Sequence, residues 1–107
     1  MIYHITTREK WEKALNSGVY THEDLQKEGF IHCSTKEQLI ASAEKHYAAF
    51  DELVILCIVE KRVKEILKWE PSRGGQLFPH VYGTIPLEAV ESQNLLVKNE
   101  VGKFEWV

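Results

Sequence analysis

The segment LVILCIVE, residues 53–60, decides the fold of this chain. Its residues are almost all apolar and several are β-branched, which favours a strand over a helix in so short a run. Because polar residues do not alternate with the apolar ones, both faces of this strand must be covered. We therefore expect residues 53–60 to form the central strand of a sheet.

The N-terminal residues predict a strand followed by a helix. The segment MIYHI, residues 1–5, has the alternation of a short strand. Thr6 and Glu9 have the spacing of a capping box, and Gly18 suits the left-handed conformation that ends many helices. These signals predict a helix between Thr6 and Gly18.

A second strand and a second long helix are expected next. Residues 21–29 are typical of one or two helical turns, and FIHC, residues 30–33, of a short strand. Ser34 and Thr35 both suit an N-cap, and apolar residues at helical spacing continue to about Phe50.

The C-terminal half favours extended chain. Pro79 and Pro86 argue against interior strands throughout their segments, because proline cannot donate to a ladder. In chain order we expect a short helix or irregular connection at 61–67, a short strand at 68–71, a mobile loop at 72–76, extended chain with turns at 77–83 and 84–90, and final strands at 90–98 and 103–107. Two or three helices near the front and five to seven strands indicate an α+β fold with mixed or mainly antiparallel sheet, in one domain of residues 1–107.

Composition restricts the partners. A net charge of −3 gives no basic field for phosphate backbones, so bulk nucleic-acid binding is not expected. The longest apolar run is too short to span a bilayer and the N-terminus lacks a signal-peptide pattern, so we expect a cytoplasmic protein without membrane contact. Cys33 and Cys57 lie in apolar strand-like runs and are expected to be buried thiols.

Two similar segments carry histidines. In YHITT, residues 3–7, and IHCST, residues 31–35, a strand-like histidine precedes two hydroxyl residues and an expected helix start. Free N–H groups at a helix start favour anions, phosphate included. His4 and His32 therefore suggest a shared ligand cleft, although either alone is equally explained as a satisfied core histidine beside an ordinary N-cap.

The segment KWEPSRGGQLFPHVYG, residues 68–83, is a third candidate. Its aromatic, acidic and basic residues suit a small-molecule pocket: Trp69, Phe78 and Tyr82 for stacking, Glu70 as a carboxylate, and Arg73 as a cation. The alternative places Trp69, Leu77 and Phe78 in the core and Glu70 in solvent before Pro71. His22 and His46 lie in polar helical surroundings and are expected on the surface.

A metal site is not predicted. No His-x-x-x-His or Cys-x-x-Cys pair is present, and no carboxylate stands near the strand histidines in a known ligand pattern. Nucleophile and dinucleotide-binding signatures are also absent from the sequence.

Several segments together resemble a bacterial family, the domain-of-unknown-function family nine-five-two: IYHITT, W-x-x-A, GFIHCST, KWEP and LFPHVYGTIPLEAV, spanning Ile2 to about Val97. That family looks like a compact branch of the ADP-ribosyltransferase superfamily, with two histidines and a third apolar position. The branch includes the tRNA 2'-phosphotransferases. The resemblance implies a split pair of small sheets that hold NAD between them.

The resemblance also implies roles by position. His4 matches a histidine that contacts the ribose on the adenosine side, and His32, with Ser34 after it, matches one beside the nicotinamide ribose. Val81 or Tyr82 is nearest to the third position. The candidate catalytic residues are His32, Glu70 and Tyr82, and the candidate NAD-contacting residues are His4, Thr6, Ser34, Thr35, His80 and Val81.

We accordingly expect an NAD-binding protein that transfers ADP-ribose to an acceptor or hydrolyses NAD. Glu70 does not align with the catalytic glutamate of the toxin-like branch, so a non-catalytic module that binds a nucleotide or small metabolite is the alternative. A metal-dependent hydrolase that uses His4, His32 and His80 is a third hypothesis.

Overall fold

The strand β4 (Glu52–Ile58) is the centre of the main sheet in the computed structural model, which describes the backbone of residues 1–107 and every side chain except that of Arg73. It pairs antiparallel with β1 (Ile2–Thr6) on one side and β8 (Val90–Lys98) on the other. The short β9 (Phe104–Trp106) completes the order β1-β4-β8-β9. The hairpin expected at the C-terminus is confirmed.

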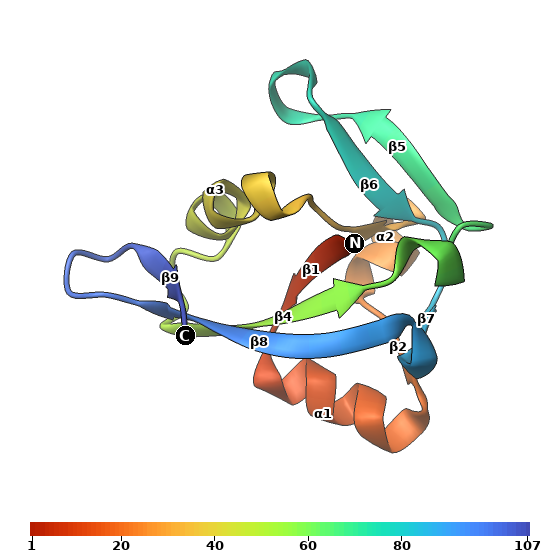
Figure 1. Cartoon of the computed structure of the whole chain (residues 1–107), viewed down its shortest axis with the longest axis horizontal. Coiled ribbons are helices and arrows are strands. Elements are labelled where there is room, and N and C mark those ends of the chain that lie inside the picture. The colour runs from red at the N-terminus through yellow and green to blue at the C-terminus, as the bar shows by residue number, and fades with distance from the viewer.

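Both faces of β4 are buried, as its apolar run predicts. Val54 and Leu56 pack in one core cluster with Trp11 of α1 (Arg8–Ser17). Leu53 and Ile55 pack in a second cluster with α3 (Lys36–His46). Figure 1 shows α1 and α3 on opposite sides of the main sheet. Each fully buried aliphatic side chain contributes roughly 1.5–3 kcal/mol to folding, so this strand anchors the domain.

A second sheet stands beside the first. It has the order β3 (Ile31–His32), β6 (Leu77–Val81) and β5 (Leu67–Pro71), all antiparallel. The β5–β6 hairpin projects from the body of the molecule in Figure 1. Tyr3 and Ser34 exchange backbone hydrogen bonds of 2.9 and 2.7 Å, which tie β1 to the chain directly after β3.

The remaining elements are short. They are β2 (Val19–Tyr20) paired with β7 (Ile85–Pro86), the helix α2 (Glu23–Glu28), and the 3-10 turns η1 (Glu60–Arg62), η2 (Arg73–Gly75) and η3 (Leu87–Ala89). Over residues 1–107 there are nine strands, more than the five to seven predicted, because β2 and β7 have only two residues each. The α+β class is confirmed, and Cys33 and Cys57 are free and buried as predicted. Over the described residues, no helix combines the length and the apolar character that crossing a bilayer requires.

Two sequence signals are displaced by one or a few residues. The N-cap of α1 is Thr7, not Thr6, and its hydroxyl accepts from the N–H of Lys10 at 3.3 Å. The helix α3 ends at His46, before the expected end near Phe50. Of the two proposed N-caps of α3, Thr35 is the correct one.

Pro79 lies in the middle strand of the second sheet, contrary to prediction. Its carbonyl accepts the N–H of Cys33 at 3.0 Å, so its ring nitrogen faces the β3 side as well. On the β5 side Pro79 stands opposite Trp69 without breaking the ladder. Because Pro79 has no N–H for the carbonyl of Cys33, β3 stops at His32, and proline is tolerated at that point.

Candidate functional site

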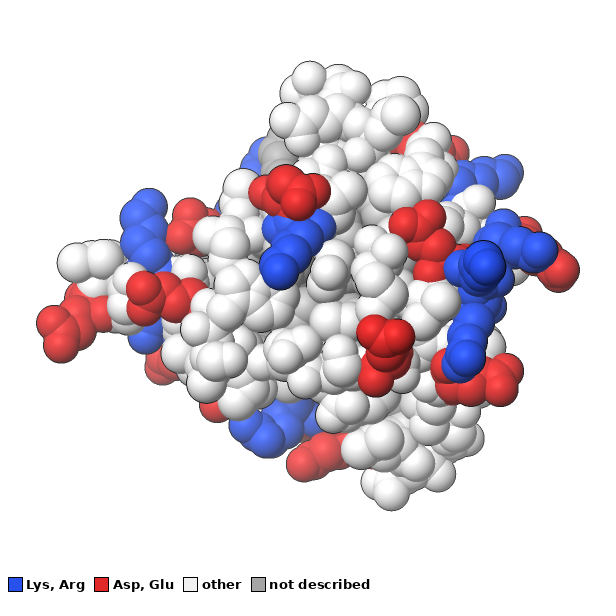
Figure 2. All heavy atoms as spheres, viewed as in Figure 1, with Lys and Arg blue, Asp and Glu red and all other residues white. Residues whose placement is uncertain are grey.

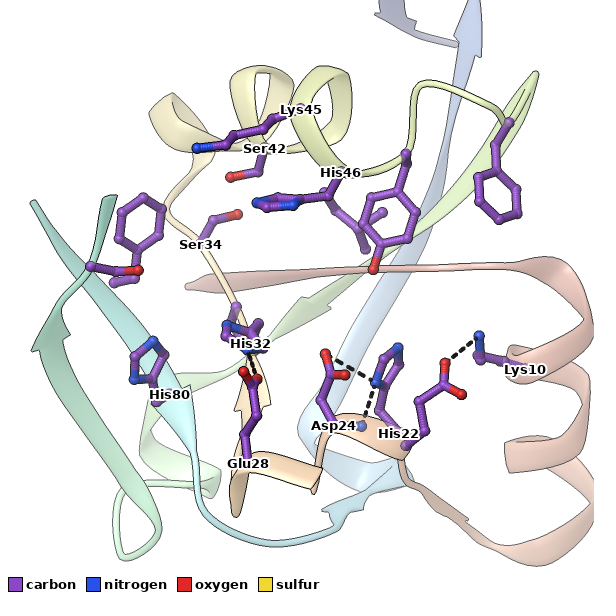
Figure 3. A pocket seen from close by; sticks show the side chains of 17 residues that line it. Lys10, His22, Asp24, Glu28, His32, Ser34, Ser42, Lys45, His46 and His80 are labelled. Carbon is purple, nitrogen blue, oxygen red and sulfur yellow. Dashed lines mark hydrogen bonds and ion pairs between the residues drawn. The ribbon is translucent and has the colours of Figure 1, made fainter. Parts of the chain in front are cut away.

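A cavity of about 720 Å³ opens between α2, α3 and one face of the second sheet. Its wall carries four of the five histidines of the chain, namely His22, His32, His46 and His80. Lysines, carboxylates, serines and aromatic rings complete the lining (Figure 3). This mixture of apolar surface and a few polar groups is typical of a small-molecule site.

His32 reaches the cavity from β3. Gly29 ends α2 in the left-handed conformation at φ 89°, which turns the chain so that His32 comes back to Glu28. The Nε2–H of His32 donates to the carboxylate of Glu28. Phe30 lies on the same side of the chain, with its ring centroid 4.7 Å from that of His32.

His80 stands directly opposite His32 in the β3–β6 register, and the two ring centroids are 5.5 Å apart. The side chain is only 7% exposed. Its Nδ1–H donates to Glu70 at 2.8 Å, and Phe30 stacks on its ring at 4.0 Å. Its Nε2 is buried and has no hydrogen-bond partner among the described residues. With Nδ1 donating to Glu70, Nε2 is a buried acceptor that no described group satisfies.

Glu70 and Tyr82 support His80 from β5 and from the end of β6. The hydroxyl of Tyr82 donates to Glu70 at 2.5 Å. This hydrogen bond, and then the one from His80, lowers the pKa of Glu70, and the same carboxylate raises the pKa of Tyr82. Neither residue belongs to the cavity wall. Glu70 can act on a ligand only through His80.

His4 does not open into the cavity, so the expectation that both histidine rings share it is wrong. Its Nδ1–H donates to the carbonyl of His32 at 2.6 Å, and its Nε2 is hydrogen-bonded to the hydroxyl of Tyr20 at 2.6 Å. That hydroxyl is also 2.9 Å from the hydroxyl of Thr6. Burial lowers the pKa of His4 to about 3. Alternation along β1 explains this: His4 and Thr6 share the face turned to the core, while Ile5 on the other face lines the cavity.

Of the other predicted residues, some line the cavity and some do not. Ser34 is buried and lines the cavity. Thr35 is used by α3: its hydroxyl accepts from the N–H of Gln38 at 3.2 Å, and its own N–H donates to the Gln38 side chain at 3.0 Å. Val81 is fully buried in the core cluster with Ile31. The side chain of Arg73, proposed as a cation, lies outside the described part of the structure.

Much of the cavity wall was missed from the sequence, including the polar group His22, Asp24 and Glu28. His22 was expected on the surface but is buried, because its Nδ1 caps α2 by accepting from the N–H of Asp24 at 3.1 Å. Burial lowers the pKa of His22. The available signal was the spacing of Asp24 and Glu28, because i,i+4 places side chains on one face of a helix, followed by Gly29 as a helix end that can turn the chain back toward it.

Charge around the site is mixed. The cavity wall contains two lysines, Lys10 and Lys45, and the carboxylates of Glu23, Asp24 and Glu28. Lys10 is already paired with Glu23 at 3.4 Å. Figure 2 shows acidic and basic side chains interspersed on one face of the molecule, with no continuous basic field there.

Comparison with known proteins gives the family. A model described as "Protein of unknown function (DUF952)" matches residues 5–93. Two crystal structures of protein CC0527 from Caulobacter crescentus, one of them a double mutant, have a TM-score of 0.87 and 35% identity and cover 97% of this chain and 92% of that chain. Its solution NMR structure has a TM-score of 0.83 and 34% identity and covers 95% and 89%. No protein with a curated description matches the chain.

None of these descriptions states a ligand or an activity, so NAD binding and the likeness to ADP-ribosyltransferases stay predictions. The motifs that suggested the family extend over the same region that the family model matches. This chain therefore belongs to the DUF952 family.

Proposed function

We propose that this protein binds NAD or ADP-ribose in the cavity and is an ADP-ribosyltransferase-like enzyme. The observation that carries the proposal is the pair of imidazoles, His32 and His80, on one wall of the cavity, the second with a buried ring nitrogen that lacks a partner. Buried polar groups without partners are rare in native proteins and point to a ligand or water. The cavity volume of about 720 Å³ lies within the usual range for ligand sites.

The chemistry follows from the charges. The bond between C1′ of the nicotinamide ribose and the ring nitrogen breaks, its electron pair goes to nicotinamide, and positive charge builds on the ribose. The carboxylate of Glu28, held beside His32, stabilises that charge. A water or acceptor hydroxyl bonds to C1′ and passes its proton to Nε2 of His80. Glu70 orients His80 through Nδ1, and Tyr82 orients Glu70.

A non-catalytic nucleotide-binding module is the second candidate. Glu70 and Tyr82, both proposed as catalytic from the sequence, lie outside the cavity wall. Glu70, the carboxylate of β5, then does not contact the ligand directly. The cavity wall therefore has fewer groups that could take part in catalysis than the sequence predicted.

Thermal unfolding with NAD, ADP-ribose or AMP, in the presence of EDTA, tests the binding step. A ligand at a hundredfold excess over its Kd stabilises the native state by about 2.7 kcal/mol. In a domain of this size the melting temperature then rises by on the order of ten degrees. His32→Ala should remove most of the rise, while Glu12→Gln on the exposed face of α1 should keep it. No shift with any of the three at millimolar concentration contradicts the proposal.

Release of nicotinamide from NAD, followed by chromatography, separates enzyme from binder. We expect slow turnover that His32→Ala reduces to background. Glu70→Gln should slow it by roughly tenfold or more, because the imidazole loses its orienting carboxylate. A wild-type protein that binds NAD but releases no nicotinamide, even with cell extract as acceptor, favours the non-catalytic module.

A further inference from the structure

Three ligand-type side chains meet where α2 turns into β3. One ligand atom from each of Asp24, Glu28 and His32 lies within 4.8 Å of the other two. Asp24 and Glu28 are one helical turn apart, and the chain reversal at Gly29 brings His32 to the same side. Figure 3 shows the three side chains together at the cavity wall.

His80 supplies an independent observation beside this group. Its Nδ1 is held by the carboxylate of Glu70 at 2.8 Å, while its buried Nε2 has no partner among the described residues. Because Glu70 occupies Nδ1, the ring presents Nε2 as an acceptor in a fixed orientation. Nε2 is the ring nitrogen farther from the β6 backbone, and His80 lines the same cavity with its ring 5.5 Å from that of His32.

We propose that Asp24, Glu28 and His32 bind a divalent first-row transition cation such as Zn²⁺ or Mn²⁺, and that a water on this cation donates a hydrogen bond to Nε2 of His80. Three protein ligands and one water are the usual set of a catalytic zinc site. One imidazole with two carboxylates favours this class of ion over Ca²⁺ or Mg²⁺, which prefer six or more oxygen ligands or retain most of their waters.

The cation explains features that hydrogen bonding alone leaves open. The bond between His32 and Glu28 satisfies those two residues but gives no reason for Asp24 to approach them. The water bound to the cation gives Nε2 of His80 the partner that it lacks.

Two consequences concern the chemistry of the cavity. A bound divalent cation lowers the pKa of its water toward 7, so that His80 stands beside a ready nucleophile. It also changes the local charge, since the diphosphate of a nucleotide would otherwise face Asp24 and Glu28. The metal site stands on its own ligands and does not require that NAD be the substrate.

The test uses the full chain without an affinity tag, freed of metal with EDTA and then dialysed. Zn²⁺ and Mn²⁺ are titrated by calorimetry, and Co²⁺ by its visible absorption, which reports the coordination geometry. We expect one ion per chain. Glu28→Gln, Asp24→Asn and His32→Ala should each weaken binding by roughly a hundredfold or more, since even supporting residues of a metal site contribute tenfold to a hundredfold.

Glu23→Gln is the matched control, because Glu23 lies next to Asp24 on α2 but pairs with Lys10 at 3.4 Å. The metal affinity of this variant should stay within about twofold of the wild type, because an exposed ion pair such as Glu23–Lys10 contributes little energy. Circular dichroism establishes that each variant is folded. His80→Phe should keep the ion but change the Co²⁺ spectrum, because the bound water loses its acceptor.

No binding of Zn²⁺, Mn²⁺ or Co²⁺ at stoichiometric concentration overturns the proposal. Equal losses in Glu28→Gln and Glu23→Gln overturn it too, because binding would then be general to surface carboxylates. The NAD measurements are made in EDTA and the metal titrations without nucleotide, so a failure of one proposal is distinguishable from a failure of the other.

Discussion

Two histidine corners of this molecule come from similar sequence and differ in what their rings can do. In the closed corner, defined by His4, Tyr20 and Thr6, both nitrogens of His4 are bonded inside the protein. In the open corner, defined by His32 and His80, the rings line a cavity and one buried nitrogen is unpaired. The closed corner is part of the core, whereas the open corner has groups left for a ligand.

Replacing the histidine by phenylalanine in each corner should distinguish the two. The larger loss of unfolding free energy is expected in the closed corner. His4→Phe removes the donor to the His32 carbonyl and the partner of the Tyr20 hydroxyl, both inside the protein. A buried polar group left unpaired costs about 1–3 kcal/mol, so the loss in unfolding free energy should be roughly 3–5 kcal/mol. Urea denaturation measures it. A loss below about 1 kcal/mol, the typical worth of one hydrogen bond, would mean that the network does not hold the core.

Tyr20→Phe breaks the same network at its next member. Tyr20 is fully buried, and the change removes only the hydroxyl that joins His4 and Thr6. The expected loss is about 2 kcal/mol, because Nε2 of His4 loses its donor. Tyr3→Phe, on the other face of β1, is the control. Its hydroxyl makes no hydrogen bond within the described residues, so the two variants should differ clearly in urea midpoint.

The closed corner should also make the fold sensitive to acid. The pKa of His4 is about 3 in the folded protein, against about 6.5 in an unfolded chain. As pH falls from 6.5 toward 3, the unfolded chain binds a proton that the folded one excludes, so stability is lost on acidification. The slope should be about 1.4 kcal/mol per pH unit from this residue. Urea titrations in EDTA at several pH values measure it. His4→Phe should show a smaller slope, and an equal slope would assign the acid sensitivity to another group.

Part of the fold was predictable because it depends on local sequence. The apolar run that became β4 needs two covered faces wherever it lies, and the Thr35 and Gln38 capping box depends on residues three apart. Pro79 was misjudged because the cost of a missing N–H depends on which neighbour the nitrogen faces. That neighbour is set by the pairing with Cys33, 46 positions back in the printed sequence.

The site was less predictable for the same reason. The pattern of histidine, hydroxyls and helix start marked His32 and Ser34, and both line the cavity. It also marked His4, whose outcome depended on Tyr20 of β2, the hydroxyl of which donates a hydrogen bond to Nε2 of the ring. His22 was assigned to the surface because its neighbours are polar, although its own ring caps a helix. Residue type and spacing indicate which groups could bind a ligand. Whether those groups are already hydrogen-bonded inside the protein depends on residues from distant parts of the chain.

The smallest effect is expected from His80→Phe, the counterpart of His4→Phe. The substitution keeps an aromatic ring to stack on Phe30. It removes a buried nitrogen that has no partner in the described structure. Glu70 loses one donor but keeps the Tyr82 hydroxyl and is about one-third exposed, so water can replace the lost hydrogen bond. In metal-free buffer we expect the free energy of unfolding to change by no more than about 1 kcal/mol. An increase would be the more informative result, because removing an unsatisfied buried group relieves its desolvation penalty. Urea denaturation beside His4→Phe gives the comparison directly. A loss of unfolding free energy as large as that of His4→Phe would show that the His80 side chain also stabilises the fold. Its unpaired nitrogen would then no longer distinguish the open corner from the closed one.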